Sequence, residues 1–281
     1  MLDRLKASAR QKLQRAVEEV VQAELASTRQ RLEDMHAESL AKTQALSDQL
    51  SAQLDEVNDR FGPVFDRLHE LEWRARRDIA YALDIDAIAD SAAFVREHMP
   101  KAQRFWHPHE TLRFALGEVK GTGLALEFGV ASGTTLKLIA EALSEELRVV
   151  GFDTFDGLPE VWRTDFPAGE FAQETIPDVP GAELVAGLFE DTLPGFLAGC
   201  DDAVGFLHLD ADLYSSTKTV LDLIGDRLRP GAVVVFDEFF NFPGWQEHEY
   251  LAWSEFVGSS GRSFEYLAYT GSNEQVVVRL D

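Results

Sequence analysis

The sequence is poor in cysteine, with Cys200 as the single example among 281 residues. One cysteine excludes an intramolecular disulfide framework and a zinc site built from several cysteines. No apolar run approaches the roughly 20 residues of a membrane-spanning helix. The basic N-terminal stretch is not followed by the apolar core of a signal peptide. We therefore expect a cytoplasmic protein without a membrane span.

Basic residues are scarce after residue 77. The chain carries 49 acidic and 26 basic residues, a net charge of −23. Residues 1–77 hold 14 acidic and 13 basic residues, so residues 78–281 hold 35 and 13 and carry nearly the whole acidic surplus. Such a surplus repels phosphate backbones, which argues against a nucleic-acid partner. It is compatible with cations and with neutral small molecules.

Glycine and proline are nearly absent from residues 1–77, where they occur once each, at Gly62 and Pro63. The abundance of Ala, Leu, Gln, Glu and Arg there favours helix. From Leu46 to Leu71, apolar residues recur in steps of three and four, which is typical of a coiled coil or helical hairpin. We interpret residues 1–77 as a coiled-coil region that makes the protein a homo-oligomer. The alternative is a helical layer packed on the following domain, and Gly62-Pro63 would end or kink the helix.

Strands alternate with helices from about residue 120 onward. Continuous apolar strands in this alternation predict a doubly wound α/β fold whose mostly parallel sheet is covered on both faces. We expect seven strands, the last two forming a hairpin, in a domain spanning residues 120–281. Residues 78–119 are expected to form a helical linker that covers the active site. Ligands of such sheets bind at the carboxyl ends of the strands.

Two features at these strand ends favour an adenosine-type ligand. Gly129 and Gly133 permit a tight turn after the first strand, although Ala131 departs from the dinucleotide-binding glycine spacing. Asp153 ends the second strand, where an acid can accept ribose hydroxyls. The alternatives are that the glycines serve packing and that Asp153 caps the turn that follows it.

Five blocks taken in order resemble the class I S-adenosylmethionine-dependent methyltransferases. The resemblance is closest to the metal-dependent macrocin/mycinamicin-type sugar O-methyltransferases, and it covers roughly residues 120–245. The blocks are LEFGVASGTT, GFDTFDGLPE, GLFEDTLP, LHLDADLYSST and RPGAVVVFDEF.

The resemblance implies two sets of site residues. The cofactor S-adenosyl-L-methionine would be bound by Glu127, Gly129, Ser132, Gly133, Asp153, Gly187 and Phe189. Asp210, Asp237 and Glu238 would hold Mg²⁺, because carboxylates suit a hard cation. Glu238 stands where the family commonly has Asp, so its role as a ligand is the least secure of the three.

A base must take the proton of the methylated hydroxyl. The candidates are Asp210, His107, His109 and His208. His107 and His109 lie just before the first strand, where related enzymes cover the cofactor, but a packing segment is an equal alternative. His208 lies within a strand, where a histidine is more often part of the core.

These observations predict a Mg²⁺-dependent O-methyltransferase acting on a hydroxyl of a sugar-containing or other polyhydroxylated small molecule or glycan. We expect its substrate mouth to include Trp162, Phe166, Trp245 and Tyr250, whose alternative role is core packing. A coiled-coil scaffold protein with a vestigial methyltransferase domain is one alternative function. A related metal-dependent enzyme of the same fold, such as a hydroxylase-like relative, is the other.

Overall fold

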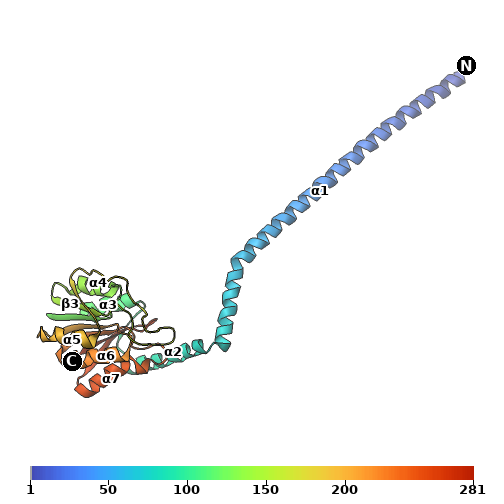
Figure 1. Cartoon of the computed structure of the whole chain (residues 1–281). Helices are drawn as coiled ribbons and strands as arrows, with labels where there is room; N and C mark the ends of the chain where they lie inside the picture. Colours follow the sequence, from blue (N-terminus) through green and yellow to red (C-terminus); the bar gives the residue numbers. More distant parts are fainter. Residues whose placement is uncertain (1) are drawn as a thin grey trace. The chain divides into compact units, whose positions relative to one another are not determined.

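The computed structural model describes residues 2–281, apart from the side chains of residues 3 and 4. The chain divides into two compact units, Met1–Arg77 and Asp78–Asp281 (Figure 1). Among the helices of the described residues, none combines the length and apolarity needed to cross a membrane.

The first unit is a single helix, α1 (Leu2–Arg77), of 76 residues. It continues through Gly62 and Pro63, so these residues do not end it, although Pro63 removes one N–H donor from the helical ladder. Its apolar side chains are exposed, with Leu54 at 55%, Phe61 at 53% and Leu68 at 56%. Most helices in proteins owe their stability to a packed apolar face, and this face of α1 has no cover within its own unit.

The second unit is built on one sheet with the strand order β1-β7-β8-β6-β5-β2-β3-β4. All neighbouring pairs are parallel except those of β8, which runs antiparallel to β6 and β7. The sequence predicted seven strands, and the structure has eight. The additional strand is β1 (Gln103–Phe105), three residues paired with the edge strand β7 inside the segment expected to be a helical linker. So short a strand leaves no periodic pattern to detect.

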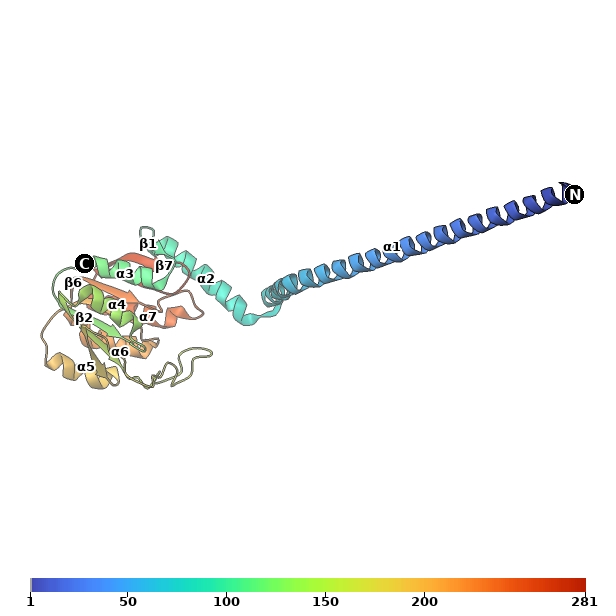
Figure 2. The ribbon, with the colours of Figure 1, turned by 90° about the horizontal axis from the view of Figure 1, so that it is seen from above.

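Helices cover both faces of this sheet (Figures 1 and 2). On β2, Leu124, Leu126 and Phe128 pack into the core cluster shared with α2, α5, α6 and α7. Ala125 points to the opposite cluster, which includes residues of α3 and α4. Both faces are therefore buried, which explains why the strands read as continuous apolar runs.

The other elements have the following bounds: α2 Ile79–His98, α3 Pro108–Glu118, β2 Gly123–Phe128, α4 Thr134–Leu143, β3 Leu147–Asp153, β4 Ala182–Ala186, α5 Phe189–Ala198, β5 Val204–Leu209, α6 Tyr214–Ile224, the short 3₁₀ helix η1 Gly225–Arg227, β6 Leu228–Phe236, the short 3₁₀ helix η2 Trp245–Glu247, α7 Glu249–Ser260, β7 Phe264–Thr270 and β8 Val276–Leu280.

Candidate functional site

A cavity of about 850 Å³ lies at the carboxyl ends of the four central strands β2, β3, β5 and β6. Gly129, Asp153, Asp210 and Asp237, which end or follow these strands, all line it. Parallel strands bring their carboxyl ends to one edge of the sheet, which is where ligands of doubly wound folds bind. The four strand ends singled out in the sequence therefore meet in one cavity.

The turn after β2 is shaped by close packing at Gly129. Gly129 has φ +92°, and a Cβ atom there would lie 1.6 Å from the carbonyl oxygen of Asp210. Gly133 caps α4 with φ +79°, and the Ser132 hydroxyl is hydrogen-bonded to that of Thr134 at 2.9 Å. Gly129 is thus required by the approach of two strand ends, whereas Ser132 and Gly133 are not among the residues that line the cavity.

Asp153 is anchored by backbone donors. Its Oδ2 accepts the N–H groups of Val130 and Ala131 at 2.8 and 2.7 Å, and its Oδ1 accepts that of Phe155 at 2.7 Å. A carboxylate has about four acceptor positions, so about one of them stays free toward the cavity. Asp153 therefore caps the turn after its own strand and the glycine turn, and retains capacity for one ligand hydroxyl.

The segment after β4 reaches the same cavity. Phe189 begins α5 and lines the cavity, and its ring packs edge-on against Phe128 at 5.1 Å. Gly187 does not line it, but its N–H donates to the backbone oxygen of Asp153 at 2.9 Å. Gly187 thus joins the two strand ends, while Phe189 offers an apolar wall.

Asp210 and Asp237 lie close together at the ends of two neighbouring strands. Together with His208 they form a group whose potential ligand atoms all lie within 4.8 Å of one another. β5 and β6 are adjacent and parallel, with Leu209 paired to Phe236, so the residues that follow both strands emerge side by side.

His208 lies between two carboxylates beneath this group. Its Nδ1 donates to Glu127 Oε1 at 2.8 Å, and its Nε2 lies 3.8 Å from Asp237 Oδ1. Burial lowers the pKa of His208, but the nearby carboxylates of Asp237 and Glu127 outweigh burial and raise the pKa well above its usual value. A histidine with a raised pKa already holds its proton over a wider pH range, so His208 is disfavoured as the base that accepts the hydroxyl proton.

Glu127 is fully buried and does not line the cavity. Burial raises its pKa against the opposing effect of His208. The position of Glu127 is that of a partner for His208, one layer below the ligand-facing residues. Burial also acts to raise the pKa of Asp237, but the bond from His208 and the charge on His208 prevail and hold it below its ordinary value.

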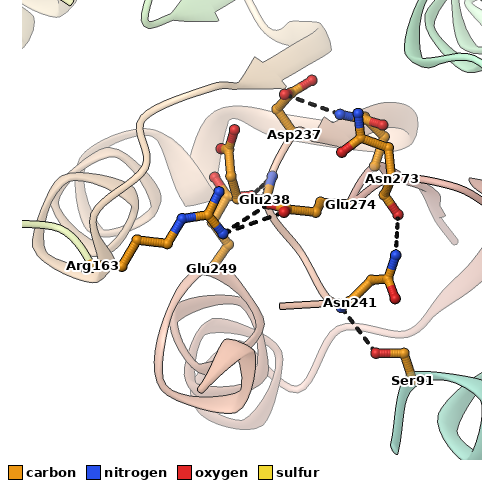
Figure 3. A network of polar contacts seen from close by, with 9 residues as sticks. Ser91, Arg163, Asp237, Glu238, Asn241, Glu249, Asn273 and Glu274 are labelled. Atoms are coloured by element: carbon orange, nitrogen blue, oxygen red, sulfur yellow. Dashed lines mark hydrogen bonds and ion pairs between the residues drawn. The ribbon is translucent and has the colours of Figure 1, made fainter. Parts of the chain in front are cut away.

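Glu238 lies outside the group formed by His208, Asp210 and Asp237, although it lines the cavity. Its Oε2 is buried without a hydrogen-bond partner among the described residues. Its backbone N–H donates to Oε2 of the fully buried Glu249 on α7 at 3.0 Å (Figure 3). Burial, followed by the charges of Asp237 and Asp210, raises the pKa of Glu238 well above its usual value.

Asp212 is a site residue to which the sequence analysis assigned no role. It lines the cavity, is 8% exposed and has φ +57°. Such strained backbone in a residue other than glycine is concentrated at functional sites. Burial and the charge of Asp237 raise the pKa of Asp212 to about 7. The sequence signal for Asp212 was that it is the second acid of the DAD triplet, since capping of the next helix alone did not require two acids.

Arg163 and Glu274 bridge the mouth of the cavity (Figure 3). Arg163 lies in the β3–β4 loop, and its Nη1 is 3.3 Å from both carboxylate oxygens of Glu274 in the β7–β8 turn. Its guanidinium also stacks 3.8 Å from the ring centre of Trp162 and 4.6 Å from that of Phe242. The pair joins two loops that are about 110 residues apart in the chain, a contact that no local pattern indicates.

Of the residues expected to cover the active site or to form its substrate mouth, some line the cavity and others do not. His109 is exposed and lines the cavity. Trp162 and Phe166 also line the cavity. His107 is exposed at the N-cap of α3 and does not line it. Trp245 and Tyr250 also lie outside the lining, and they pack with each other and with Phe94 of α2.

The doubly wound sheet brings the glycine turn and the acidic strand ends to one ligand-sized cavity. Residues 126–239 match the family described as a methyltransferase domain. A segment of 56 residues is 39% identical to the 8-demethyl-8-(2,3-dimethoxy-alpha-L-rhamnosyl)-tetracenomycin-C 4'-O-methyltransferase of Streptomyces olivaceus. That match spans 20% of each chain, so it covers one fifth of the length of the curated relative.

Two solved structures of methyltransferases have similar folds. CalS11, a calicheamicin methyltransferase, is 26% identical, with 60% of this chain and 76% of CalS11 covered at a TM-score of 0.48. The O-methyltransferase NovP is 21% identical, with 60% of this chain and 78% of NovP covered at a TM-score of 0.45.

Proposed function

We propose that this chain is an S-adenosylmethionine-dependent O-methyltransferase that uses Mg²⁺ to methylate a hydroxyl of a sugar-containing or other polyhydroxylated small molecule or glycan. The observation that carries the proposal is the convergence of Asp210 and Asp237 in one cavity with the glycine turn and Asp153. The family match over residues 126–239 supports the cofactor and the reaction class.

The residues of the site fit a divalent cation. Asp210, Asp212, Asp237 and Glu238 crowd one cavity, and mutual repulsion contributes to the raised pKa values of Asp210, Asp212 and Glu238. The buried Oε2 of Glu238 has no partner among the residues described. A hard cation held by carboxylate oxygens would relieve both conditions. We assign Asp210 and Asp237 as its principal ligands and Glu238 as a third carboxylate within the same cavity.

The cavity also fits the cofactor. The free acceptor position of Asp153 suits a ribose hydroxyl, the ring of Phe189 suits a flat apolar group, and the acidic lining suits a cationic sulfonium. We assign cofactor binding to the turn Gly129–Gly133, with Ser132 exposed on its rim, and to Asp153 and Phe189. Glu127 and Gly187 do not line the cavity. Glu127 acts through its contact with His208, and Gly187 acts through its bond to the backbone of Asp153.

The chain's own residues orient the reacting groups. When bound, Mg²⁺ lowers the pKa of the acceptor hydroxyl and S-adenosylmethionine supplies the methyl group. Methyl transfer would form a C–O bond and break the C–S bond of the cofactor, and the hydroxyl proton would pass to a carboxylate of the site. Asp210 is one candidate for that carboxylate, but we assign it as a ligand. Asp212 lines the same cavity but lies outside the group formed by His208, Asp210 and Asp237. We therefore assign Asp212 as the residue that accepts the proton.

The lining of the cavity favours an uncharged acceptor over a phosphorylated one. Arg163 is already paired with Glu274, and Ser215 at the start of α6 donates to Glu160 at 2.6 Å. A phosphate entering here would meet carboxylates at the positions where it requires cations or free donors. Trp162 and Phe166 at the mouth provide apolar surface for a sugar ring or an aglycone.

Calorimetric titration and a methyl-transfer assay test the proposal. We expect the protein to bind S-adenosylmethionine, and a divalent cation to be needed for methylation of glycoside acceptors. Asp237→Asn should abolish cation binding and transfer. The exposed Asp201→Asn is the matched control and should leave both unchanged. Transfer that survives EDTA would contradict the metal role, and absence of cofactor binding would favour a scaffold protein with a vestigial domain.

The exposed apolar face of α1 supports a second part of the proposal. We infer that α1 pairs with further copies of the chain, because seven apolar residues repeat at steps of four and three between Leu50 and Leu71. Phe61 lies near the middle of this repeat and Leu68 one heptad further on.

A further inference from the structure

Gln275 has a buried side-chain amide that contacts Asp237 and has no place in the mechanism above. It directly precedes β8, whose first residue Val276 pairs with Phe236, the last residue of β6, so Gln275 lies beside Asp237, which directly follows β6. Its backbone oxygen accepts the N–H of Thr270 at 2.9 Å, and the preceding Glu274 oxygen accepts that of Phe239 at 3.1 Å. The backbone that carries the amide is therefore held from two sides.

The orientation of this amide is determined by its neighbour. Gln275 is 3% exposed, and its Nε2 donates to Asp237 Oδ2 at 3.1 Å, the bond drawn at Asp237 in Figure 3. Turning the amide over would place its oxygen against a carboxylate, two acceptors without a proton between them. In the present orientation Gln275 Oε1 is buried without a partner among the described residues, and Gln275 is one of the residues that line the cavity.

The two carboxylate oxygens of Asp237 have different neighbours because of this amide. Oδ2 accepts a hydrogen bond from the Gln275 amide, whereas Oδ1 lies 3.8 Å from His208 Nε2. A cation approaching Asp237 through both oxygens would therefore compete with the Gln275 amide at Oδ2, whereas a cation held through Oδ1 alone would not. Mg²⁺ requires near-octahedral geometry, whereas Ca²⁺ readily accepts a carboxylate through both oxygens.

We propose that Gln275 is a positioning residue that restricts Asp237 to one coordinating oxygen and thereby makes the site prefer Mg²⁺ over Ca²⁺. The inference rests on the proposed function insofar as that function places a cation at Asp237. Partners of ligating side chains typically change metal affinity by about 10- to 100-fold when they are removed.

The test is the affinity of the full-length protein for each cation, measured by calorimetry without cofactor or acceptor. In Gln275→Met, which keeps the volume but removes the donor, Mg²⁺ binding should weaken by about 10-fold or more. Ca²⁺ binding should change by less than about 3-fold, because Asp237 gains a second free oxygen. Gln275→Asn, too short to reach Asp237, should shift the ratio in the same direction if Gln275→Met fails to fold.

Gln246→Met is the matched control, since Gln246 is exposed on η2, and it should leave both affinities unchanged. Melting temperatures in EDTA show whether each variant is folded. Equal weakening of both cations, or no change in either, would overturn the selectivity role. If the wild-type protein binds neither cation in a manner sensitive to Asp237→Asn, both this inference and the proposed metal site are wrong. Mg²⁺ binding that depends on Asp237 but not on Gln275 would preserve the proposed function and refute only this inference.

Discussion

Gly129→Ala should destabilise the domain far more than an ordinary glycine substitution at positive φ. The added Cβ would lie 1.6 Å from the Asp210 oxygen, whereas real Cβ contacts begin near 3.0 Å, so the strand ends must separate by about 1.4 Å. That movement weakens two backbone bonds at the turn, Gly129 N–H to Phe152 and Asp210 N–H to Phe128, each 2.9 Å long. With about 1 kcal/mol for each bond and about 1–2 kcal/mol for the left-handed conformation, we expect a loss of about 3–4 kcal/mol.

Gly231→Ala is the matched control for this substitution. Gly231 has φ +80°, and a Cβ there would meet no atom of the described residues within 4 Å. Only the conformational cost of about 1–2 kcal/mol should apply. The assay is urea unfolding followed by tryptophan fluorescence, because four of the five tryptophans lie in residues 78–281. If the two variants differed by less than about 0.5 kcal/mol, the close approach would not govern the turn, since distant sites add within that margin.

Three further outcomes are expected. Glu249→Ala removes the acceptor of the Glu238 N–H and should lower the free energy of unfolding in urea by about 1–3 kcal/mol. Glu249→Gln keeps an acceptor oxygen and should therefore retain most of the wild-type stability. Trp253→Ala empties a site that is 1% exposed and should cost about 3–5 kcal/mol by the same measurement; a cost below 1 kcal/mol would contradict the packing. Phe61→Glu in the full chain should lower the sedimenting mass if α1 pairs with other copies, and an unchanged mass would refute that role for its apolar face.

The fold was predictable because its strands are long apolar runs separated by clear helices. The alternation fixes a parallel sheet covered on both faces, and the carboxyl ends of its strands fix the edge at which acids gather. β1 was missed because three residues at a sheet edge form only by pairing with β7, a contact between distant parts of the unit. Of the two effects expected of Gly62-Pro63, an end or a kink, the end did not occur, because one lost backbone bond does not outweigh helical residues on both sides.

The site was predictable where a residue's role depends on its own strand. Asp210 and Asp237 each follow a central strand, so adjacency in the sheet brings them together. The partners of Asp237 and of the neighbouring Glu238 come from elsewhere: Gln275 of the closing hairpin contacts Asp237, and Glu249 of α7 accepts the N–H of Glu238. Their contacts depend on the packing of whole elements, and neither residue stands in a motif.

Carboxylates gather at the edge of the sheet where we propose that a cation binds. Asp210, Asp237 and Glu238 share the cavity, while His208 is already placed between Glu127 and Asp237. Desolvated carboxylates without compensation are costly, and protonation, the direction in which burial moves Asp210 and Glu238, is one way to lower that cost. A divalent cation lowers it without protonation and keeps the carboxylates as ligands. In the proposed function, the acids that are costly to desolvate would be the ones that bind the positively charged ligand, and this links the acidic composition physically to the proposed chemistry.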